Sequence, residues 1–475
     1  MSAPVSRHAP RAAALALLLG ISGGACAADG APAVDEELRD LRQQAQQILR
    51  RIDELEQRQR SGAAPEPAVA TQTPPPVIAT QPPPPAVAAA VPAKATAPME
   101  TSRVLAAGAG KGFLELQSGN TTLTVGGHAR FEAFFNNPSV PGDAGVRDDI
   151  GYAIADIPIS APGGPRQLSL SARNSRFWFK TRTATEMGPV NTLMELDFFG
   201  ADGNERTVNG NGPRMRHAYA EFGGFTFGQT YTTFMDVFTW PTAYNDPAGV
   251  VIVRQPLVRW TRPFSGGEFL LGAEQPETTL TKTDGTRLTP SDDRWPDLAG
   301  RATWFRDWGQ LSLSGLLRQI RQDGAVAGVS DAKVGGAIHL AGRIKTLGQD
   351  NLRFGLAGGN ALGRYTAYNT FNDGSVDAQG RITLNRVYSG YLSYEHWWNR
   401  EWRSSAVYSL AGAHNDLSVV PATVTRRGES YHLNLSWSPV ENALFGVEYM
   451  YARREQEDSQ AGQLNRLYFN AQFMF

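Results

Sequence analysis

The sequence predicts an all-β transmembrane barrel of 16 antiparallel strands, preceded by an N-terminal coiled-coil helix and a Pro/Ala-rich tether. The first observation is a period-two alternation of apolar and polar residues from residue 121 to residue 475, in stretches of about nine to fourteen residues. Membrane strands have this length, whereas strands of soluble sandwiches are usually shorter. The second is that short turns and long polar loops alternate between the stretches. The third is a heptad pattern, followed by a Pro-rich segment, ahead of the first stretch.

The composition excludes other classes of protein. The 475 residues are 41% hydrophobic and 19% charged with a mean hydropathy of -0.32, so the chain lacks the repeated apolar runs of about 20 residues that a polytopic helical membrane protein needs. Its 45 basic and 46 acidic residues leave a formal net charge of -1, which argues against a nucleic-acid-binding protein. Important electrostatic effects must therefore be local.

Residues 1–27 have the pattern of a secretory signal peptide. Basic Arg7 and Arg11 precede an apolar stretch, and small residues end at Ala27 as an A-x-A cleavage site. The alternative is a lipoprotein signal with Cys26 acylated, but the residues before it lack the usual Leu or Val. Cleavage after Ala27 removes the only cysteine, so we expect no disulfide, no Cys-based metal site and no thiol nucleophile.

Residues 34–60 predict a periplasmic coiled coil. Apolar residues recur there with alternating spacings of four and three, while the other positions are mostly Gln, Arg, Glu and Asp. The seam residues are Val34, Leu38, Leu41, Ala45, Ile48, Ile52 and Leu55. Self-association would bury this seam; the alternative is an amphipathic helix lying on the barrel or on a membrane surface. The mixture of Leu, Ala and Ile leaves the number of helices open.

Residues 61–110 predict an extended linker. Up to residue 98 they are almost entirely Ala, Pro, Val, Thr and Gln, a composition that cannot bury enough surface to fold. Pro-rich chains of this kind adopt polyproline II at about 3.1 Å per residue. The coiled coil is therefore expected to hang on a long, semi-stiff tether below the barrel.

The barrel is predicted over residues 111–475. An even strand number with both ends of the barrel chain on one side is what a closed bacterial outer-membrane barrel requires. The expected strands are 121–136, 174–185, 189–199, 214–223, 224–232, 254–263, 267–275, 297–307, 309–320, 332–346, 349–361, 384–397, 400–412, 428–438, 441–453 and 463–475.

The apolar face of these strands is predicted to contact outer-membrane lipid. A lumen enclosed by 16 strands is too wide for side chains to fill, so the apolar face must point outward. Aromatic residues near strand ends fit the girdles at the two membrane interfaces, although aromatics also favour strands in general. The expected girdle residues are Trp304, Trp308, Trp397, Trp398, Trp402, Tyr449 and Tyr451.

The last predicted strand ends on an aromatic residue. Phe475, Phe473 and Phe469 share one face, with polar residues between them. This pattern matches the sorting signal that the barrel assembly machinery reads, so we expect that machinery to be a partner during biogenesis.

Strand alternation places several arginines in the lumen. On this basis the candidate substrate-binding residues are Arg130, Arg176, Arg182, Arg214, Arg216 and Arg254. Arg259 would need a bulge near Pro256 to join them. Rings of Arg in a pore favour anions, and a guanidinium matches a carboxylate with two hydrogen bonds. The alternative is that these arginines only neutralise acidic wall residues, namely Glu132, Glu195 and Asp197.

Five sequence blocks resemble the DcaP-like family of trimeric outer-membrane porins. They are SARNSRFWFKT (171–181), ELDFFG (195–200), RMRHAYAEFGGFTFGQTYTTF (214–234), RQPLVRWTR (254–262) and HLNLSWSPVENALFGVEYMYARRE (432–455). The resemblance implies a 16-stranded homotrimer, an N-terminal periplasmic coiled coil, and passive uptake of small anionic compounds of the dicarboxylate type.

Residues 233–253 are predicted to fold into the lumen. The segment is too apolar for an external loop and too rich in Pro, Gly and Asn for a strand. It follows the fifth strand, and in general porins the corresponding loop narrows the barrel. Asp236 and Asp246 are then expected to face the lumenal arginines. The alternative is an ordinary surface loop.

Together these features predict a porin of the Gram-negative outer membrane for passive diffusion of small hydrophilic solutes, with anionic solutes preferred. No cofactor or metal is expected, and the seven His are too scattered to indicate an enzyme. The alternative is an envelope anchor in which the coiled coil is the functional part.

Overall fold

The computed structural model describes residues 114–139, 154–159, 165–201 and 210–475. The signal peptide (1–27), the coiled coil (34–60) and the linker (61–110) lie outside the described residues and remain predictions. No helix in the described ranges is long and apolar enough to cross a membrane.

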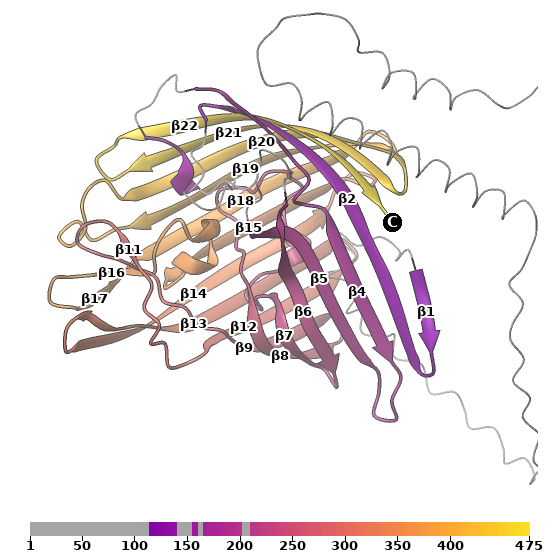
Figure 1. The fold of residues 1–475 in the computed structure, drawn as a ribbon, viewed down its shortest axis with the longest axis horizontal. Helices are drawn as coiled ribbons and strands as arrows, with labels where there is room; N and C mark the ends of the chain where they lie inside the picture. The colour runs from indigo at the N-terminus through magenta and orange to yellow at the C-terminus, as the bar shows by residue number, and fades with distance from the viewer. Residues whose placement is uncertain (1–113, 140–153, 160–164, 202–209) are drawn as a thin grey trace, which may run out of the picture. The chain divides into compact units, whose positions relative to one another are not determined.

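The described chain forms a closed antiparallel β-barrel (Figure 1). Sixteen strands follow one another around it, and the last returns to pair with the first. These strands are β2 (Thr121–Asn137), β4 (Arg176–Thr183), β5 (Val190–Ala201), β6 (Gly212–Phe222), β7 (Phe225–Tyr231), β8 (Arg254–Phe264), β9 (Gly267–Glu274), β12 (Asp297–Arg306), β13 (Gly309–Val326), β14 (Val329–Lys345), β15 (Asn351–Asn360), β18 (Arg386–Trp397), β19 (Trp402–His414), β20 (Thr425–Val440), β21 (Ala443–Gln456) and β22 (Ala461–Met474).

Two further strands pair with the parts of the long strand β2 that β22 and β4 leave unpaired. β1 (Leu114–Ser118) pairs with its first residues on the β22 side, and β3 (Gln167–Ser171) pairs with its last residues on the β4 side. Phe475 and Gly127 exchange backbone hydrogen bonds of 3.0 and 3.1 Å where β22 ends and β1 takes over. Because unpaired backbone groups are costly in lipid, these additions cover what β4 and β22 leave open.

All 16 predicted barrel strands are present, and the largest difference is in one hairpin. The predicted strands 309–320 and 332–346 correspond to β13 and β14, which continue to Val326 and Val329 with only residues 327–328 between them. The sequence prediction ended both strands early because their outer parts are polar. A strand that extends beyond the membrane needs no apolar face, so its hydropathy pattern fades while its hydrogen bonding continues.

The apolar face of the barrel points outward, as predicted. Ile338 and Leu433 are 66% and 62% exposed, whereas Arg318 on an inward position is only 1% exposed. At the end of the barrel with the short turns, here called the turn end, Trp402, Trp437, Phe445 and Phe473 form a row of ring contacts 5.4–5.7 Å apart. This row is the expected arrangement of an interfacial girdle.

Trp397 does not belong to this girdle, which corrects the prediction. Its indole N–H donates to Glu395 at 3.1 Å, and the Arg403 guanidinium lies 5.1 Å from its ring. Glu395 is buried in the lumen. Trp397 and Trp398 are neighbours in sequence, so strand alternation sends them to opposite faces.

The segment 232–253 after β7 folds into the lumen, as predicted. It contains the short helix η2 (Val237–Thr239) and runs along the inner wall from β9 to β22. Its contacts include Thr232 with Glu274, Phe234 with His339, Trp240 with Arg353, Gly249 with Ser409, Ala248 with Ser430, and Asn245 with Glu448 and Arg466. We call this segment the inward loop.

The wall beneath the inward loop consists of small side chains. Phe234, Met235 and Val251 of the loop pack on buried wall alanines, which are Ala299, Ala337, Ala357, Ala411 and Ala413. Gly249 lies so close to the wall that a Cβ atom there would collide with the carbonyl oxygens of Leu410 and Gly390. Its position therefore requires glycine.

A second segment, residues 361–385 between β15 and β18, also folds inward and was not predicted. It contains η3 (Gly363–Tyr365), η4 (Ala367–Asn369), β16 (Gly374–Val376) and β17 (Ile382–Leu384). With β10 (Leu280–Thr281) and β11 (Arg287–Leu288) from the β9–β12 connection it forms a small four-stranded sheet. The remaining short helix, η1 (Ile154–Asp156), lies against β20 and β21.

Candidate functional site in the barrel lumen

The hydrogen bonds of the inward loop described above go to β9 and to β14 to β22, and its Tyr244 packs beside Phe134 of β2. Strands β2, β4, β5 and β6 carry most of the predicted arginines. A bulge in β6 adds to the set. The β5–β6 register passes from Glu195↔His217 to Leu196↔Met215, so Arg216 is the extra residue. As a result Arg216 and His217 are both buried inside the barrel while Met215 is exposed outside.

Three arginines of this wall share two carboxylates. Arg214 donates from Nε and Nη2 to the two oxygens of Asp197 at 3.0 and 2.8 Å. Arg216 donates to both Glu195 and Asp197 at 2.7 Å, and Arg176 reaches Glu195 at 3.3 Å. The side chain of Arg214 is 42% exposed, against 7% for Arg216. Arg214 therefore faces the lumen, while Arg216 supports the carboxylates from behind.

Arg130 is fixed across the seam between β2 and β22. Its Nε lies 3.0 Å from Glu132 and its Nη2 donates to the Tyr468 hydroxyl at 2.6 Å, which in turn donates to Glu132 at 2.6 Å. Each group of this triad has a partner, so Arg130 is held rigidly against the wall.

Arg173 was missed by the sequence prediction. It lies between β3 and β4, where the wall strand is interrupted, and its guanidinium is 4.7 Å from the ring of Phe199. The guanidinium of Arg214 is also 4.7 Å from this ring. The aromatic residue thus places two cations beside each other, an arrangement that needs residues from two strands and has no local sequence signal.

The other two candidates lie at opposite ends of the wall. Arg182 is exposed at the turn end of β4, and Arg254 lies at the start of β8 with its guanidinium 5.5 Å from the ring of Tyr231. Neither forms an ion pair with a described residue, and the same is true of Lys180. Four arginines share three carboxylates on this wall and three further cations have none, so its charge is positive.

The strand alternation predicted for β8 was wrong. The register with β7 is continuous from Tyr231↔Arg254 to Phe225↔Trp260, without a bulge at Pro256. Val258 is exposed outside, and Arg259 points inward and donates to the Tyr231 carbonyl at 3.3 Å. The prediction set the inward parity from Arg254, so that Arg259 would have needed a bulge near Pro256; the structure brings Arg259 inward without one.

Asp236 of the inward loop has other partners than the arginines predicted for it. Asp236 accepts the backbone N–H of Phe238 at 3.1 Å and the Gln310 side chain at 2.9 Å, so it caps η2 rather than facing an arginine. Asp246 is hydrogen-bonded to the Tyr368 hydroxyl of the second inward segment.

Comparison with known proteins identifies the family of this chain. A family model described as DcaP outer membrane protein matches residues 143–475. The chain belongs to the DcaP outer membrane protein family. The crystal structure of the outer membrane channel DcaP of Acinetobacter baumannii is similar, with a TM-score of 0.63 and 19% identity over 77% of this chain and 100% of that chain; at this identity the likeness shows the fold alone.

An anion-selective porin from Comamonas acidovorans is also similar, with a TM-score of 0.48 and 14% identity over 75% of this chain and 100% of that chain. None of the curated proteins matches the chain. The family and the fold are those of outer-membrane porins. This DcaP-family chain is therefore a porin-type channel of the Gram-negative outer membrane. Its family and fold are those of channels rather than of enzymes.

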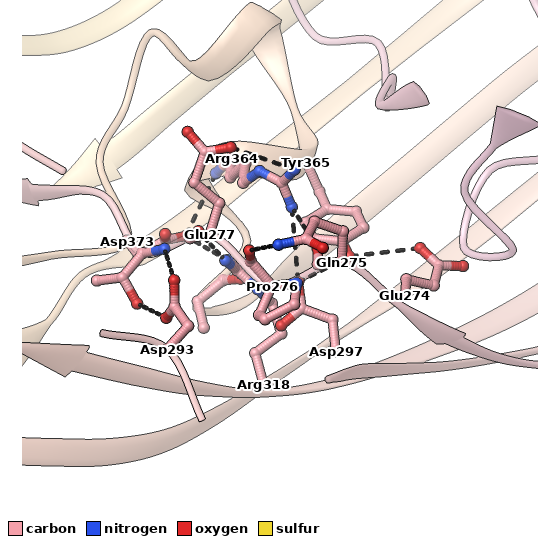
Figure 2. A network of polar contacts seen from close by, with 12 residues as sticks. Glu274, Gln275, Pro276, Glu277, Asp293, Asp297, Arg318, Arg364, Tyr365 and Asp373 are labelled. Carbon is pink, nitrogen blue, oxygen red and sulfur yellow. Dashed lines mark hydrogen bonds and ion pairs between the residues drawn. The ribbon is translucent and has the colours of Figure 1, made fainter. Parts of the chain in front are cut away.

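A buried network fixes the second inward segment of this DcaP-family barrel at the end opposite the turns, the loop end (Figure 2). Arg318 of β13 contacts Asp297 at 2.9 Å and Asp373 at 2.6 Å, and it also donates to the carbonyls of Ala361 and Glu277. A single fully buried cation thereby joins β12, the β9–β12 connection and segment 361–385.

Tyr365 and Arg364 extend the network. The Tyr365 hydroxyl donates to Asp297 at 2.9 Å, and Arg364 lies 3.7 Å from the same carboxylate and 3.5 Å from Glu277. Burial and the neighbouring carboxylates of Asp297 and Glu274 raise the pKa of Tyr365, which keeps it a hydrogen-bond donor. No local sequence pattern indicates this network, because its members come from four separate segments.

Proposed function

We propose that this DcaP-family channel admits small hydrophilic solutes by passive diffusion and prefers anions, in particular dicarboxylate-type compounds. The observation that supports this preference is the positive wall formed by β2, β4, β5, β6 and the start of β8. Its proposed solute-contacting or field-generating residues are Arg130, Arg176, Arg182, Arg214, Arg216 and Arg254.

The ion pairs on this wall give its arginines different roles. Asp197 occupies Nε and Nη2 of Arg214, which leaves Nη1 for a solute in the lumen. Arg216 and Arg176 hold the carboxylates of Asp197 and Glu195 in place. The exposed guanidinium of Arg214 is therefore held in one orientation. A preorganised donor costs little to order when the anion arrives, and the surplus positive charge raises the local anion concentration.

We further propose that the protein is a homotrimer with its coiled coil in the periplasm, embedded in outer-membrane lipid and inserted by the barrel assembly machinery. The heptad seam of residues 34–60 and the family resemblance support the trimer. The alternative function is an envelope anchor with a secondary pore. Deleting residues 28–100 separates the two, because a porin keeps its solute flux whereas an anchor loses its phenotype.

Ion selectivity in planar bilayers tests the proposed preference. Under a KCl gradient the reversal potential should favour chloride, and succinate should transiently block the current. The double variant Arg176→Glu and Arg214→Glu should invert the preference, because lumenal substitutions tune selectivity without exposing charge to lipid.

The control is Arg166→Glu with Arg400→Glu, which makes the same change in net charge at two exposed positions without an ion-pair partner among the described residues. It should leave the sign of the reversal potential unchanged. A cation-selective wild type that succinate does not block would show that the arginines only neutralise Glu132, Glu195 and Asp197.

A further inference from the structure

A second group of cations lies on the opposite wall of the lumen, at the turn end. It surrounds a cavity of about 570 Å³ that is lined by Phe238 of the inward loop and by the ends of β12 to β15 and β18. We propose that this cavity, here called the exit pocket, binds organic anions that carry an apolar body. Its proposed binding residues are Phe238, Phe305, Arg306, Arg343, Lys345 and Trp397.

Strand register places Arg343 and Lys345 on the inner wall. Arg306 is paired with Gly309, so it has the opposite parity and lines the cavity from the end of β12. Gln310, Arg343 and Arg353 are direct partners across β13, β14 and β15. Lys345 follows Arg343 by two residues and therefore points to the same face. On β18 and β19 the directly paired residues Trp397 and Arg403 continue this row.

Most of the positive charge in the exit pocket is not compensated. The side chains of Arg343 and Lys345 form no hydrogen bond or ion pair with any described residue, and the Arg306 side chain donates to the carbonyls of Gly266 and Phe305. On the other wall, by contrast, Arg130, Arg176, Arg214 and Arg216 each have a carboxylate partner. A half-buried guanidinium without a partner loses hydration and gains nothing in return, so an anion is its natural complement.

Two acidic residues near the pocket already have partners. Asp350 accepts the backbone N–H of Trp397 at 2.8 Å, contacts His396 at 2.7 Å and accepts the Tyr394 hydroxyl at 2.9 Å. The hydrogen bonds from Trp397 and His396 lower the pKa of Asp350 below its ordinary value. Glu395 is engaged by Arg353, Asn351 and Trp397. Neither carboxylate pairs with Arg343 or Lys345.

Three of the other residues that line the exit pocket are aromatic. Phe238, Phe305 and Trp397 come from three different elements and meet at the cavity. Phe238 is held there because the Asp236 side chain accepts its backbone N–H and also binds Gln310. An inorganic anion would leave these rings in water, whereas an anion with an apolar body covers them while its charged group reaches the cations.

The exit pocket lies on the turn-end side of the inward loop, so it is separate from the wall proposed to set ion preference. In an outer-membrane barrel the short turns face the periplasm. A solute that has passed the inward loop would pause at this pocket before release. This proposal rests on the proposed function in one respect, which is that the solute reaches the exit pocket through the pore.

Current-block measurements with benzoate and acetate test the proposal. Each is added to the turn-end side of the full-length channel in planar bilayers. Benzoate should block at a concentration about tenfold lower than acetate, because only benzoate covers the aromatic lining. The double variant Arg343→Gln and Lys345→Gln should raise the half-blocking concentration of benzoate about tenfold.

The matched control is Arg166→Gln with Arg386→Gln, two exposed cations that form no ion pair with a described residue. Benzoate should block the current of this control variant at the same concentration as in the wild type. Unheated gel mobility verifies that each variant is folded. Equal block by benzoate and acetate, or an unchanged benzoate block in Arg343→Gln with Lys345→Gln, would overturn the proposal. A cation-selective channel whose benzoate block still depends on Arg343 and Lys345 would refute the proposed function and leave the exit pocket standing.

Discussion

The two sides of the lumen use their inward positions in opposite ways. On β2, β4, β5 and β6, here called the bare side, these positions carry large Arg, Glu, Asp and Trp side chains, many of them buried among their neighbours. On β12 to β20 many of them are Ala or Ser where the inward loop lies against the wall. Large charged side chains fill their own share of the lumen, whereas small ones leave room for a second layer of chain.

Hydrogen bonding explains why the covered side also contains hydroxyls. The backbone N–H groups of Ala248 and Gly249 donate to Ser430 and Ser409 at 2.9 and 2.7 Å. A buried irregular segment must satisfy its backbone polar groups, and wall serines provide acceptors without taking up space. The size and polarity of the inward residues therefore determine where the loop lies.

The largest effect is expected from removing the cation that joins the second inward segment to the covered side. Arg318→Met leaves Asp297 and Asp373 buried without their charge partner, a loss of about 3–5 kcal/mol in comparable buried pairs. Segment 361–385 should detach from the wall while the barrel persists. Limited proteolysis of detergent-solubilised protein should then cut within 361–385.

The matched control for this change is Arg294→Met. Arg294 is exposed and its ion-pair partner among the described residues, Asp323, lies 3.6 Å away, so its loss should cost less than about 1 kcal/mol. Equal protease resistance of Arg318→Met and the wild type would show that the small sheet and its apolar cluster hold the segment without the ion network.

A smaller effect is expected from enlarging Gly249, which tests the close packing of the covered side directly. Gly249→Val forces a side chain against the carbonyls of Leu410 and Gly390, and overpacking of this kind costs about 1–3 kcal/mol. The inward loop should move off the wall and change the single-channel conductance by at least about twofold. Gly315→Val, at a position where a Cβ meets no atom within 4 Å, is the control and should conduct like the wild type.

The contrast between the two sides also shows what could be predicted from the sequence. Alternation is a local property, so the strands and the outward position of residues such as Phe177 were predicted correctly. The composition of residues 233–253 was sufficient to predict the inward loop. Small residues at the inward positions of β12 to β20 were a usable signal for where it lies, but reading it requires the strand register first.

What the sequence could not provide depends on contacts between distant segments. Arg318 meets Asp373 across 55 residues of chain, and Phe238 meets Trp397 across an even longer separation. The error at Arg259 has another cause, since the inward parity of β8 was set from Arg254 and Arg259 was expected to need a bulge, whereas it points inward along a continuous β7–β8 register. Strand alternation alone was sufficient to predict most of the inward residues. It did not show which arginines have carboxylate partners.

The smallest and most specific effect should distinguish two neighbouring arginines of the bare side. Arg214 and Arg216 both bind Asp197, but the side chain of Arg214 is 42% exposed and that of Arg216 is 7% exposed. Arg214→Gln should therefore weaken the succinate block severalfold and leave the unheated barrel intact, because Arg216 still neutralises Asp197. Arg216→Gln should instead lower the thermal stability of the barrel, since Asp197 and Glu195 lose the cation that joins them. Heat-modifiability in gels and current block, measured on both variants, separate these outcomes. If the two variants lose succinate block equally without a difference in stability, exposure does not decide which arginine meets the solute, and the field of the whole wall carries the selectivity.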